Sequence, residues 1–287
     1  MSFAEVVANL ADKSLQTSTD DYAVDGLLYC GKCKTRKQHR ITLFGVEKEV
    51  GIPCKCRKAE SDALEARVQG MNEEVIRDRL RQEGLTDEAY LNCTFDRDDL
   101  RNPEYTKTCK RYVEEWPEMQ RLNAGVLFFG GVGTGKSFLA CAIANALIDQ
   151  MQSVSVTSLP RILSVLQGGF DEERKNLLRR IREYDLLVID DLGVERDTPY
   201  ATEQVYSVID ARYLAKKPLI ITTNLTAREI QAETNLSRRR IYDRIWEMCP
   251  IRLNITGETR RGENAEAVRI EAKRVLEGKH EKNQTSS

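Results

Sequence analysis

The chain has 287 residues, which is enough for one full α/β domain and one smaller domain. Its 44 basic and 45 acidic residues leave a formal net charge of −1, so any contact with nucleic acid must come from local basic patches rather than from overall attraction. No apolar run reaches the length of about 18 residues that predicts a membrane span, and residues 1–10 lack the features of a signal peptide. We therefore expect a cytoplasmic protein whose eight cysteines do not form disulfides.

Residues 1–60 form a cysteine-rich segment, which we expect to be a small domain of its own. Its four cysteines are Cys30 and Cys33, followed after twenty residues by Cys54 and Cys56. Two such pairs can supply four thiolates to one tetrahedral Zn²⁺, and a segment with so little apolar content needs a cross-link of this kind to fold. His39 is an alternative to one thiolate, and free buried cysteines or redox chemistry are the competing interpretations. The other four cysteines show no ligand spacing and are expected to be structural: Cys93, Cys109, Cys141 and Cys249.

Residues 58–83 predict a charged helix. Apolar side chains recur there at steps of three and four residues: Leu64, Val68, Met71, Val75 and Ile76. A short coiled coil is an alternative, although Gly70 and the limited length argue against a long one. A further helix is predicted from Asn102 to Trp116, ended by Pro117. We expect residues 61–120 to be a helical linker.

From residue 125 the pattern alternates between strands and helices. Apolar strands are predicted at 126–129, 154–157, 186–189, 219–223 and 251–255. The intervening helices are predicted at 138–151, 162–166, 176–182 and 203–214. This alternation predicts an α/β fold with a parallel sheet covered on both faces by helices. The domain is expected to span 121–262, and a charged tail, 263–287, is expected to be helical at most to about Leu276.

A phosphate-binding pattern, G-x-x-x-x-G-K-[ST], stands between the first of these strands and its helix. Glycines let the backbone aim several N–H groups at one anion, and the helix adds the positive end of its dipole. Lys136 would reach the β- and γ-phosphates, and the Ser137 hydroxyl would ligate Mg²⁺. We therefore predict that the protein binds ATP. The expected contacts are Gly131, Gly133, Thr134, Gly135, Lys136, Ser137 and Phe138.

Polar residues follow two later strands of the predicted sheet. Asp190 is placed to complete the Mg²⁺ shell, and Asp191 is placed to polarise the attacking water. A glutamate would reach one methylene further than Asp191, so we predict slow basal hydrolysis. Asn224 would lie near the γ-phosphate and orient water, although asparagine is also a common turn residue after a strand.

From about Phe95 to Arg261 the chain resembles AAA+ ATPases of the DnaC/DnaI/IstB group, which are helicase loaders and transposition helper ATPases. The resemblance rests on five segments: Gly130–Ser137, Leu186–Gly193, Ile220–Asn224, Ile241–Ile245 and Gly257–Arg261. It implies an AAA+ P-loop core in which Asn224 is the sensor-1 residue and Arg244 is an arginine finger that acts on a neighbouring subunit. Arg261 would be the sensor-2 residue. Arg260 is its alternative, because Thr259-Arg260 departs from the Ser-Tyr that precedes this arginine in the family.

In such loaders a helical insertion after the second strand touches single-stranded DNA, and the matching region here is about 159–182. Phe170 could stack on a base while nearby cations follow the phosphates. Those cations are Arg174, Lys175, Arg179 and Arg180. The alternative is an amphipathic helix with a solvated basic face and Phe170 in the core.

The resemblance implies a loader that places a hexameric replicative DNA helicase on single-stranded DNA. Residues 1–60 would bind the helicase, and the protein would form an ATP-dependent oligomer. The basic run Lys32–Arg40 could bind DNA instead. Two other functions remain open: a transposition helper ATPase, and an adaptor in which ATP binding rather than hydrolysis is the switch.

Overall fold

The computed structural model describes residues 17–43, 45–85, 87–168, 170–193 and 198–276. The chain divides into two compact units, Met1–Val75 and Ile76–Ser287, and the division falls within one long helix, α2 (Lys55–Gly84). In the described part of the chain, no helix combines the length and the apolar character needed to cross a membrane.

The N-terminal unit contains two short antiparallel hairpins. Strands β1 (Tyr22–Val24) and β2 (Leu27–Tyr29) are joined by Asp25-Gly26, and both turn residues have positive φ, as a two-residue hairpin turn of this kind requires. The second hairpin pairs β3 (Gln38–Leu43) with β4 (Val46–Gly51). The α2 helix follows and confirms the helix predicted over 58–83.

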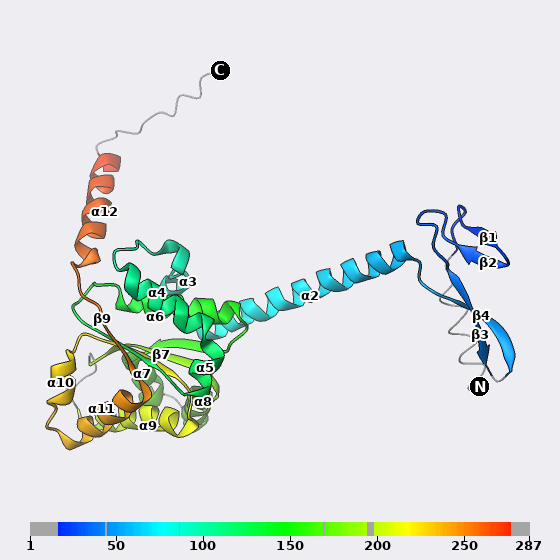
Figure 1. Ribbon diagram of the computed structural model, residues 1–287. Coiled ribbons are helices and arrows are strands. Elements are labelled where there is room, and N and C mark those ends of the chain that lie inside the picture. The colour runs from blue at the N-terminus through cyan, green and yellow to red at the C-terminus, as the bar shows by residue number, and fades with distance from the viewer. Residues whose placement is uncertain (1–16, 44, 86, 169, 194–197, 277–287) are drawn as a thin grey trace. The chain divides into compact units, whose positions relative to one another are not determined.

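A five-stranded parallel sheet forms the centre of the second unit (Figure 1). Its spatial order is β6 (Val154–Ser158), β7 (Leu186–Leu192), β8 (Leu219–Thr223), β5 (Val126–Phe129) and β9 (Ile251–Asn254). All five predicted strands are present and every pairing is parallel. The structure thus confirms the predicted α/β fold.

Helices cover both faces of this sheet. One face packs against α7 (Leu159–Gly168), α8 (Asp171–Glu183), α9 (Pro199–Ala215) and α11 (Leu236–Met248). The other face packs against α4 (Pro103–Glu114), α5 (Trp116–Arg121) and α6 (Lys136–Asp149). Short elements complete the unit: α3 (Glu88–Leu91), a 3₁₀ turn (Phe95–Arg97) and α10 (Ala227–Gln231). The last described helix is α12 (Arg260–Leu276).

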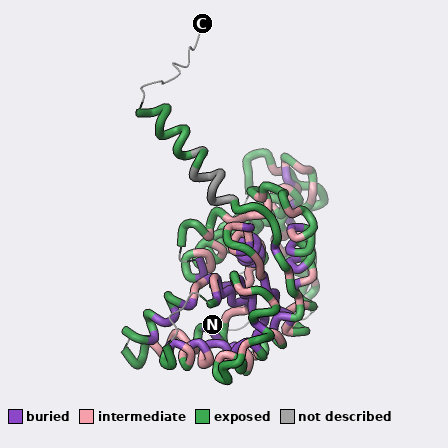
Figure 2. The backbone as a smooth tube through the Cα atoms, turned by 90° about the vertical axis from the view of Figure 1, so that its left-hand side faces the viewer, coloured by how far each residue is buried: buried purple, intermediate pink, exposed green. Residues whose placement is uncertain are grey.

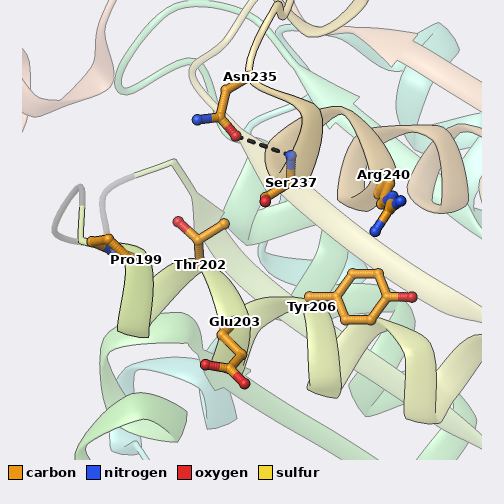
Figure 3. A pocket seen from close by; sticks show the side chains of 7 residues that line it. All are labelled: Pro199, Thr202, Glu203, Tyr206, Asn235, Ser237 and Arg240. Atoms are coloured by element: carbon orange, nitrogen blue, oxygen red, sulfur yellow. Dashed lines mark hydrogen bonds between the residues drawn. The ribbon is translucent and has the colours of Figure 1, made fainter.

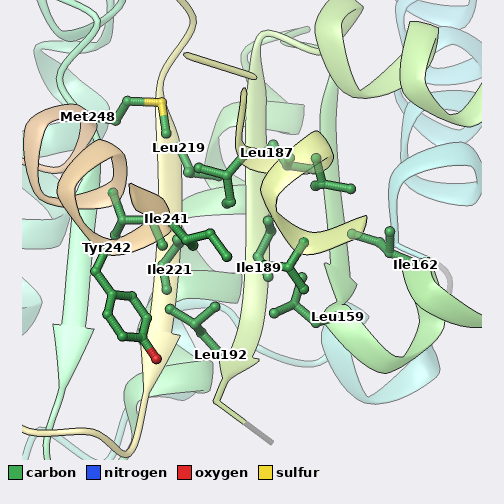
Figure 4. Close-up of a cluster of buried hydrophobic side chains, with 14 of the residues drawn as sticks. Leu159, Ile162, Leu187, Ile189, Leu192, Leu219, Ile221, Ile241, Tyr242 and Met248 are labelled. Carbon is green, nitrogen blue, oxygen red and sulfur yellow. The ribbon is translucent and has the colours of Figure 1, made fainter. Parts of the chain in front are cut away.

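Strand β7 contributes side chains to both apolar clusters, one on each face of the sheet. Leu187 and Ile189 point into the cluster drawn in Figure 4, whereas Leu186 and Val188 belong to the cluster on the opposite face. A strand buried on both faces has no need of polar positions, which explains its uninterrupted apolar run. Figure 2 colours the backbone by burial: buried residues gather in the interior, whereas the described residues of α12 are exposed.

The prediction that Pro117 ends the helix is wrong. The helix ends at Glu114, and Pro117 instead lies in the first turn of α5, where its missing N–H leaves no hydrogen bond unmade. Trp116, the first residue of α5, packs in the core beside this turn.

Arg212 is a buried cation that the sequence did not single out. Its guanidinium donates hydrogen bonds to the carbonyl oxygens of Ile181, Tyr184, Asp185 and Pro218 at 2.6–3.2 Å. It therefore ties α9 to the end of α8 and to the starts of two strands. Burial lowers the pKa of Arg212 to about 10, so it remains protonated at neutral pH.

Candidate nucleotide site and cysteine cluster

The phosphate-binding loop connects β5 to α6, as its sequence predicts. Gly133 and Gly135 have φ of 77° and 102°, which side chains rarely adopt. Gly130 also has positive φ, and a Cβ there would lie 2.3 Å from Ile255 O. The glycines are thus required both by the loop and by its close approach to the segment after β9.

Lys136 is almost fully buried at the first position of α6. Its ammonium donates to Gly130 O at 3.0 Å, to Gly131 O at 2.6 Å and to Asn224 Oδ1 at 2.9 Å. The third bond joins the loop to the end of β8, so Lys136 and Asn224 meet although they are distant in sequence.

A cavity of about 440 Å³ lies over the loop. It brings together six of the seven phosphate-binding residues predicted from the loop, all but Gly131, and two of the predicted polar strand ends. Its lining consists of Val132, Gly133, Thr134, Gly135, Lys136, Ser137, Phe138, Asp191 and Asn224. Asp190 lies just behind this lining and is nearly buried.

Thr222 joins the two aspartates. Its hydroxyl donates to Asp190 Oδ1 at 2.5 Å and accepts from the Asp191 N–H at 2.9 Å. The register of β7 and β8 shifts between Ile189 and Leu192, and Asp191 has φ of 54°. At this irregularity the side chain of Asp191 lines the cavity, whereas that of Asp190 is buried and does not line it. Thr222 was not predicted to have a role.

The segment before α12 also reaches the loop. A Cβ on Gly133 would lie 2.2 Å from Thr259 Oγ1, so Thr259 packs directly against the phosphate-binding turn. The side chains of Arg260 and Arg261 lie outside the described part of the structure, and the sensor-2 assignment remains a prediction.

Arg244, the predicted arginine finger, is engaged within its own chain. Its guanidinium lies 2.8 Å from Asp210 Oδ1 and stacks over the rings of Tyr206 and Tyr213, at 4.6 and 5.4 Å from their centroids. These partners all come from α9, against which α11 packs. Arg244 is not among the residues that line the cavity over the loop, and its action on a neighbouring subunit remains a prediction.

A second cavity, of about 540 Å³, opens between α9 and α11. Figure 3 shows Pro199, Thr202, Glu203 and Tyr206 on one side and Asn235, Ser237 and Arg240 on the other. Asn235 accepts from the Ser237 N–H and so begins α11. None of the predicted catalytic or phosphate-binding residues lines this cavity.

The predicted DNA-contacting region corresponds to α7 and α8. Phe170 stands between them and is 82% exposed, so the alternative that placed it in the core is wrong. Arg179 pairs with Glu183 at 3.2 Å, and Arg180 lies over the ring of Tyr184. Lys175 lies on α8 between Arg174 and Arg179. Arg174 donates to Gln167 O at 3.3 Å, so it links the two helices.

The four N-terminal cysteines come together. Their sulfur atoms all lie within 4.8 Å of one another, at Cys30, Cys33, Cys54 and Cys56. All eight cysteines are free in this structure. The Cys30–Cys56 and Cys54–Cys56 Sγ distances are 3.6 and 3.2 Å, close to the separation of about 3.8 Å that a tetrahedral site with Zn–S bonds of about 2.3 Å requires. The cluster is consistent with a zinc site. In the described part of the chain, His39 is not among its members.

The surroundings of the cluster favour an ionised thiol at Cys33 and a fixed turn, whereas the hydrogen bonds to Cys54 and Cys30 raise the pKa of Cys56 to about 12. The Thr35 hydroxyl, 3.0 Å from Cys33 Sγ, lowers the pKa of Cys33 to about 5, and the thiolate is the form that binds metal. Asp21 accepts from the Gly31 N–H and from Lys37, and the Lys37 bond lowers the pKa of Asp21 to about 2. Asp21 is therefore ionised at neutral pH and holds the turn between the first two cysteines.

Comparison with known proteins adds family information to this geometry. A family model described as IstB-like ATP binding protein matches residues 60–267. The replicative helicase loader DnaC of Buchnera aphidicola subsp. Schizaphis graminum is 31% identical over 165 residues, which cover 55% of this chain and 65% of that protein. The replicative helicase loader DnaC of Escherichia coli K12 is 32% identical over 139 residues, which cover 47% of this chain and 54% of that protein.

A solved structure of DnaI shares the fold. It matches with a TM-score of 0.51 at 22% identity, and covers 61% of this chain and 93% of the DnaI chain. The chain thus spans most of that structure, but no more than about two thirds of the two DnaC proteins.

Proposed function

Because the chain belongs to the family of IstB-like ATP-binding proteins, we propose that it is an ATP-dependent loader of a hexameric replicative DNA helicase onto single-stranded DNA in the cytoplasm. The observation that carries the proposal is the cavity where the phosphate-binding loop meets Asp191 and Asn224, in a chain whose relatives are named replicative helicase loaders.

In this proposal the cavity binds and hydrolyses ATP. The loop N–H groups and Lys136 hold the phosphates, and Ser137 and Asp190 hold Mg²⁺, which neutralises phosphate charge. Asp191 polarises the attacking water, and Asn224 orients it. The Thr222 hydroxyl supports this by fixing the positions of both carboxylates.

Two arginines complete the proposed ATPase. Arg244 would contact the γ-phosphate bound by a neighbouring subunit, so hydrolysis would require an oligomer. Arg261 would contact the phosphates of its own subunit, and the packing of Thr259 on Gly133 supports this because it brings the start of α12 to the loop. Hydrolysis by an isolated chain would then be slow, also because Asp191 is shorter than a glutamate.

Residues 1–60 would form a zinc-stabilised domain that binds the helicase. Four cysteines with mutually close sulfur atoms and no disulfide fit a structural Zn²⁺, which would cross-link the two hairpins and the start of α2. We further propose residues 61–120 as the helical linker, 121–262 as the ATPase domain and 263–287 as the tail.

Single-stranded DNA would bind along α7 and α8. The exposed ring of Phe170 could stack on a base, and the α8 cations could follow the phosphates. Arg174 and Arg179 already pair with acidic side chains of α8, so each phosphate contact would compete with an existing ion pair.

One competing function is that of a transposition helper ATPase, which the IstB-like family description favours. Such a protein would recruit a transposase to duplex DNA. The adaptor alternative differs in chemistry: Asp191→Asn should then retain full activity in strand loading, whereas the loader should lose it with its hydrolysis.

The first test is capture of the partner by the immobilised full-length protein. With ATP and Mg²⁺, we expect it to retain a replicative helicase from a bacterial lysate, identified by mass spectrometry. The purified helicase should then assemble on circular single-stranded DNA only when the protein and ATP are present.

Two variants control this experiment. Lys136→Ala should remove ATP binding and loading, because it removes the cation over the loop. Deletion of residues 1–60 should remove capture of the helicase but retain ATP binding. Recovery of a transposase would move the protein to the helper class, and recovery of neither partner would contradict the loader proposal.

A further inference from the structure

Helix α2 has an apolar stripe that the described part of its own chain leaves uncovered. Leu64, Val68, Met71 and Val75 are 62%, 49%, 59% and 68% exposed. Their spacing of four, three and four residues is that of a coiled-coil seam, which is narrower than the face of a helix packed on a globular core. All four belong to the N-terminal unit.

We propose that this stripe is a self-association surface, where α2 pairs with α2 of a second copy as a short antiparallel coiled coil. In this register Leu64 lies opposite Val75 of the second copy, and Val68 lies opposite Met71. The two-fold axis repeats each contact, which gives four consecutive apolar layers. The proposal goes beyond the helicase-loading function and does not depend on it.

Charges beside the seam favour the antiparallel arrangement. Arg67 and Glu74 occupy equivalent flanking positions one heptad apart. An antiparallel pair therefore places Arg67 of each copy next to Glu74 of the other copy, so the contact forms twice. A parallel pair would instead place Glu60 beside Glu65 and Arg67 beside the neutral Asn72, and its one favourable pair, Glu74 with Arg79, would compete with the Arg79–Glu83 ion pair. Like charges in such positions oppose association.

The side chains needed for these contacts are available. Within the residues that the structure describes, Arg67 and Glu74 form no ion pair in their own chain, unlike Arg79 and Arg81 further along α2. Gly70 lies on the side away from the seam, and a Cβ at Gly70 would meet nothing within 4 Å. The glycine weakens the helix but does not interrupt the apolar layers.

Sedimentation of the full-length protein without nucleotide tests the proposal. We expect the mass to rise with concentration from 32.7 kDa toward twice that value. Val68→Asp with Met71→Asp should remain a single chain at every concentration, and Gly70→Ala should dimerise more tightly, because alanine stabilises the helix outside the seam. Unchanged helical content in far-ultraviolet circular dichroism checks that each variant keeps α2 folded, because ATP binding reports only on the other unit.

A charge swap tests the direction. Arg67→Glu and Glu74→Arg should each weaken the dimer by about tenfold, and the two together should restore it to within about twofold. A protein that stays monomeric at all concentrations, or that dimerises regardless of Val68 and Met71, would overturn the proposal. Dimerisation without rescue by the swap would overturn the antiparallel register.

Discussion

Thr222 holds both aspartates of the candidate site through one hydroxyl group. It is fully buried at the end of β8, and its oxygen bonds Asp190 on one side and the backbone of Asp191 on the other. In the proposed mechanism Asp190 would hold Mg²⁺ and Asp191 would polarise water, and both roles depend on position to within a fraction of an ångström.

We expect Thr222→Val to lower the turnover number for ATP by about tenfold or more, because valine has the shape of threonine but neither bond. ATP affinity should change little, since Lys136 and the loop are untouched. The unfolding free energy should fall by about 1–3 kcal/mol, because the Asp190 carboxylate and the Asp191 N–H would each lose a hydrogen bond. Steady-state hydrolysis and thermal unfolding measure both effects.

Thr222→Ser is the matched control, because serine keeps the hydroxyl. It should retain most of the turnover. Equal losses in the serine and valine variants would show that packing at this position, rather than the hydrogen bonds, determines the rate.

For single residues, the sequence predicted which side chains belong to the site better than it predicted their hydrogen-bond partners. Lys136 follows from a local pattern whose spacing is fixed by the loop itself, and Asp190 follows from its place at the end of an apolar strand. The Thr222 contacts depend on a register shift between β7 and β8 that no local pattern encodes. Asp191 could be predicted as a candidate, but not the positive φ that accompanies it.

Between elements, the packing of α11 on α9 determines where Arg244 lies. Its ion pair with Asp210 and its two tyrosine contacts hold it against α9 of its own chain. A role on a neighbouring subunit would therefore require it to exchange these contacts for a phosphate. The residue can serve stability in one state and catalysis in another.

Two variants separate these roles. Arg244→Ala should lower the ATPase rate of the assembled oligomer by about a hundredfold or more. Asp210→Asn should leave that rate within about twofold, because it removes only the intrachain ion pair. Both should lower the unfolding free energy, each by about 1 kcal/mol. Rate measurements at saturating protein and thermal unfolding are the readouts.

The arginine-finger assignment fails if both variants reduce the ATPase rate equally. Arg244 would then act only as a bond between two helices of one chain. Arg240, which faces the cavity between α9 and α11, would be the next residue to substitute.

Elements with buried faces were predictable, and elements without them were not. The five sheet strands appear as apolar runs because helices cover both faces. The hairpins β1–β2 and β3–β4 were missed because their residues are mostly exposed and show no burial alternation, for example throughout β1. Their positions are determined by turns and by the cysteine cluster, which hydrophobic patterns do not report.

For the molecule as a whole, the two compact units have different sources of stability. The C-terminal unit has two apolar clusters, one on each face of its sheet. The N-terminal unit has few buried apolar residues in its described part and gathers them at cysteines, such as Cys30 and Cys54. Small units of this kind usually depend on a cross-link.

Cys54→Ser should therefore reduce bound zinc from one ion per chain to a small fraction, and the N-terminal unit should become sensitive to protease. ATP binding should be unchanged, because the loop belongs to the other unit. Cys93→Ser is the control, since Cys93 lies outside the cluster and should retain zinc. Metal analysis, limited proteolysis and ATP titration test the three statements; loss of ATP binding in Cys54→Ser would contradict the independence of the units.

The bond between Lys136 and Asn224 has a further consequence. An ammonium group has three donors, and two loop carbonyls and the Asn224 oxygen already accept from it. An arriving phosphate must displace at least one of them. Asn224→Ala should therefore bind ATP a few times more tightly while hydrolysing it more slowly, in equilibrium binding and turnover assays; weaker binding by this variant would contradict the competition.

If the phosphate displaces the Asn224 oxygen, the Asn224 amide loses its lysine partner when the nucleotide binds. In its proposed sensor role, Asn224 would then also compete with the nucleotide for the Lys136 ammonium. The affinity for ATP would be a difference between two sets of bonds to one cation, and the arrival of a ligand would release a side chain at the end of β8.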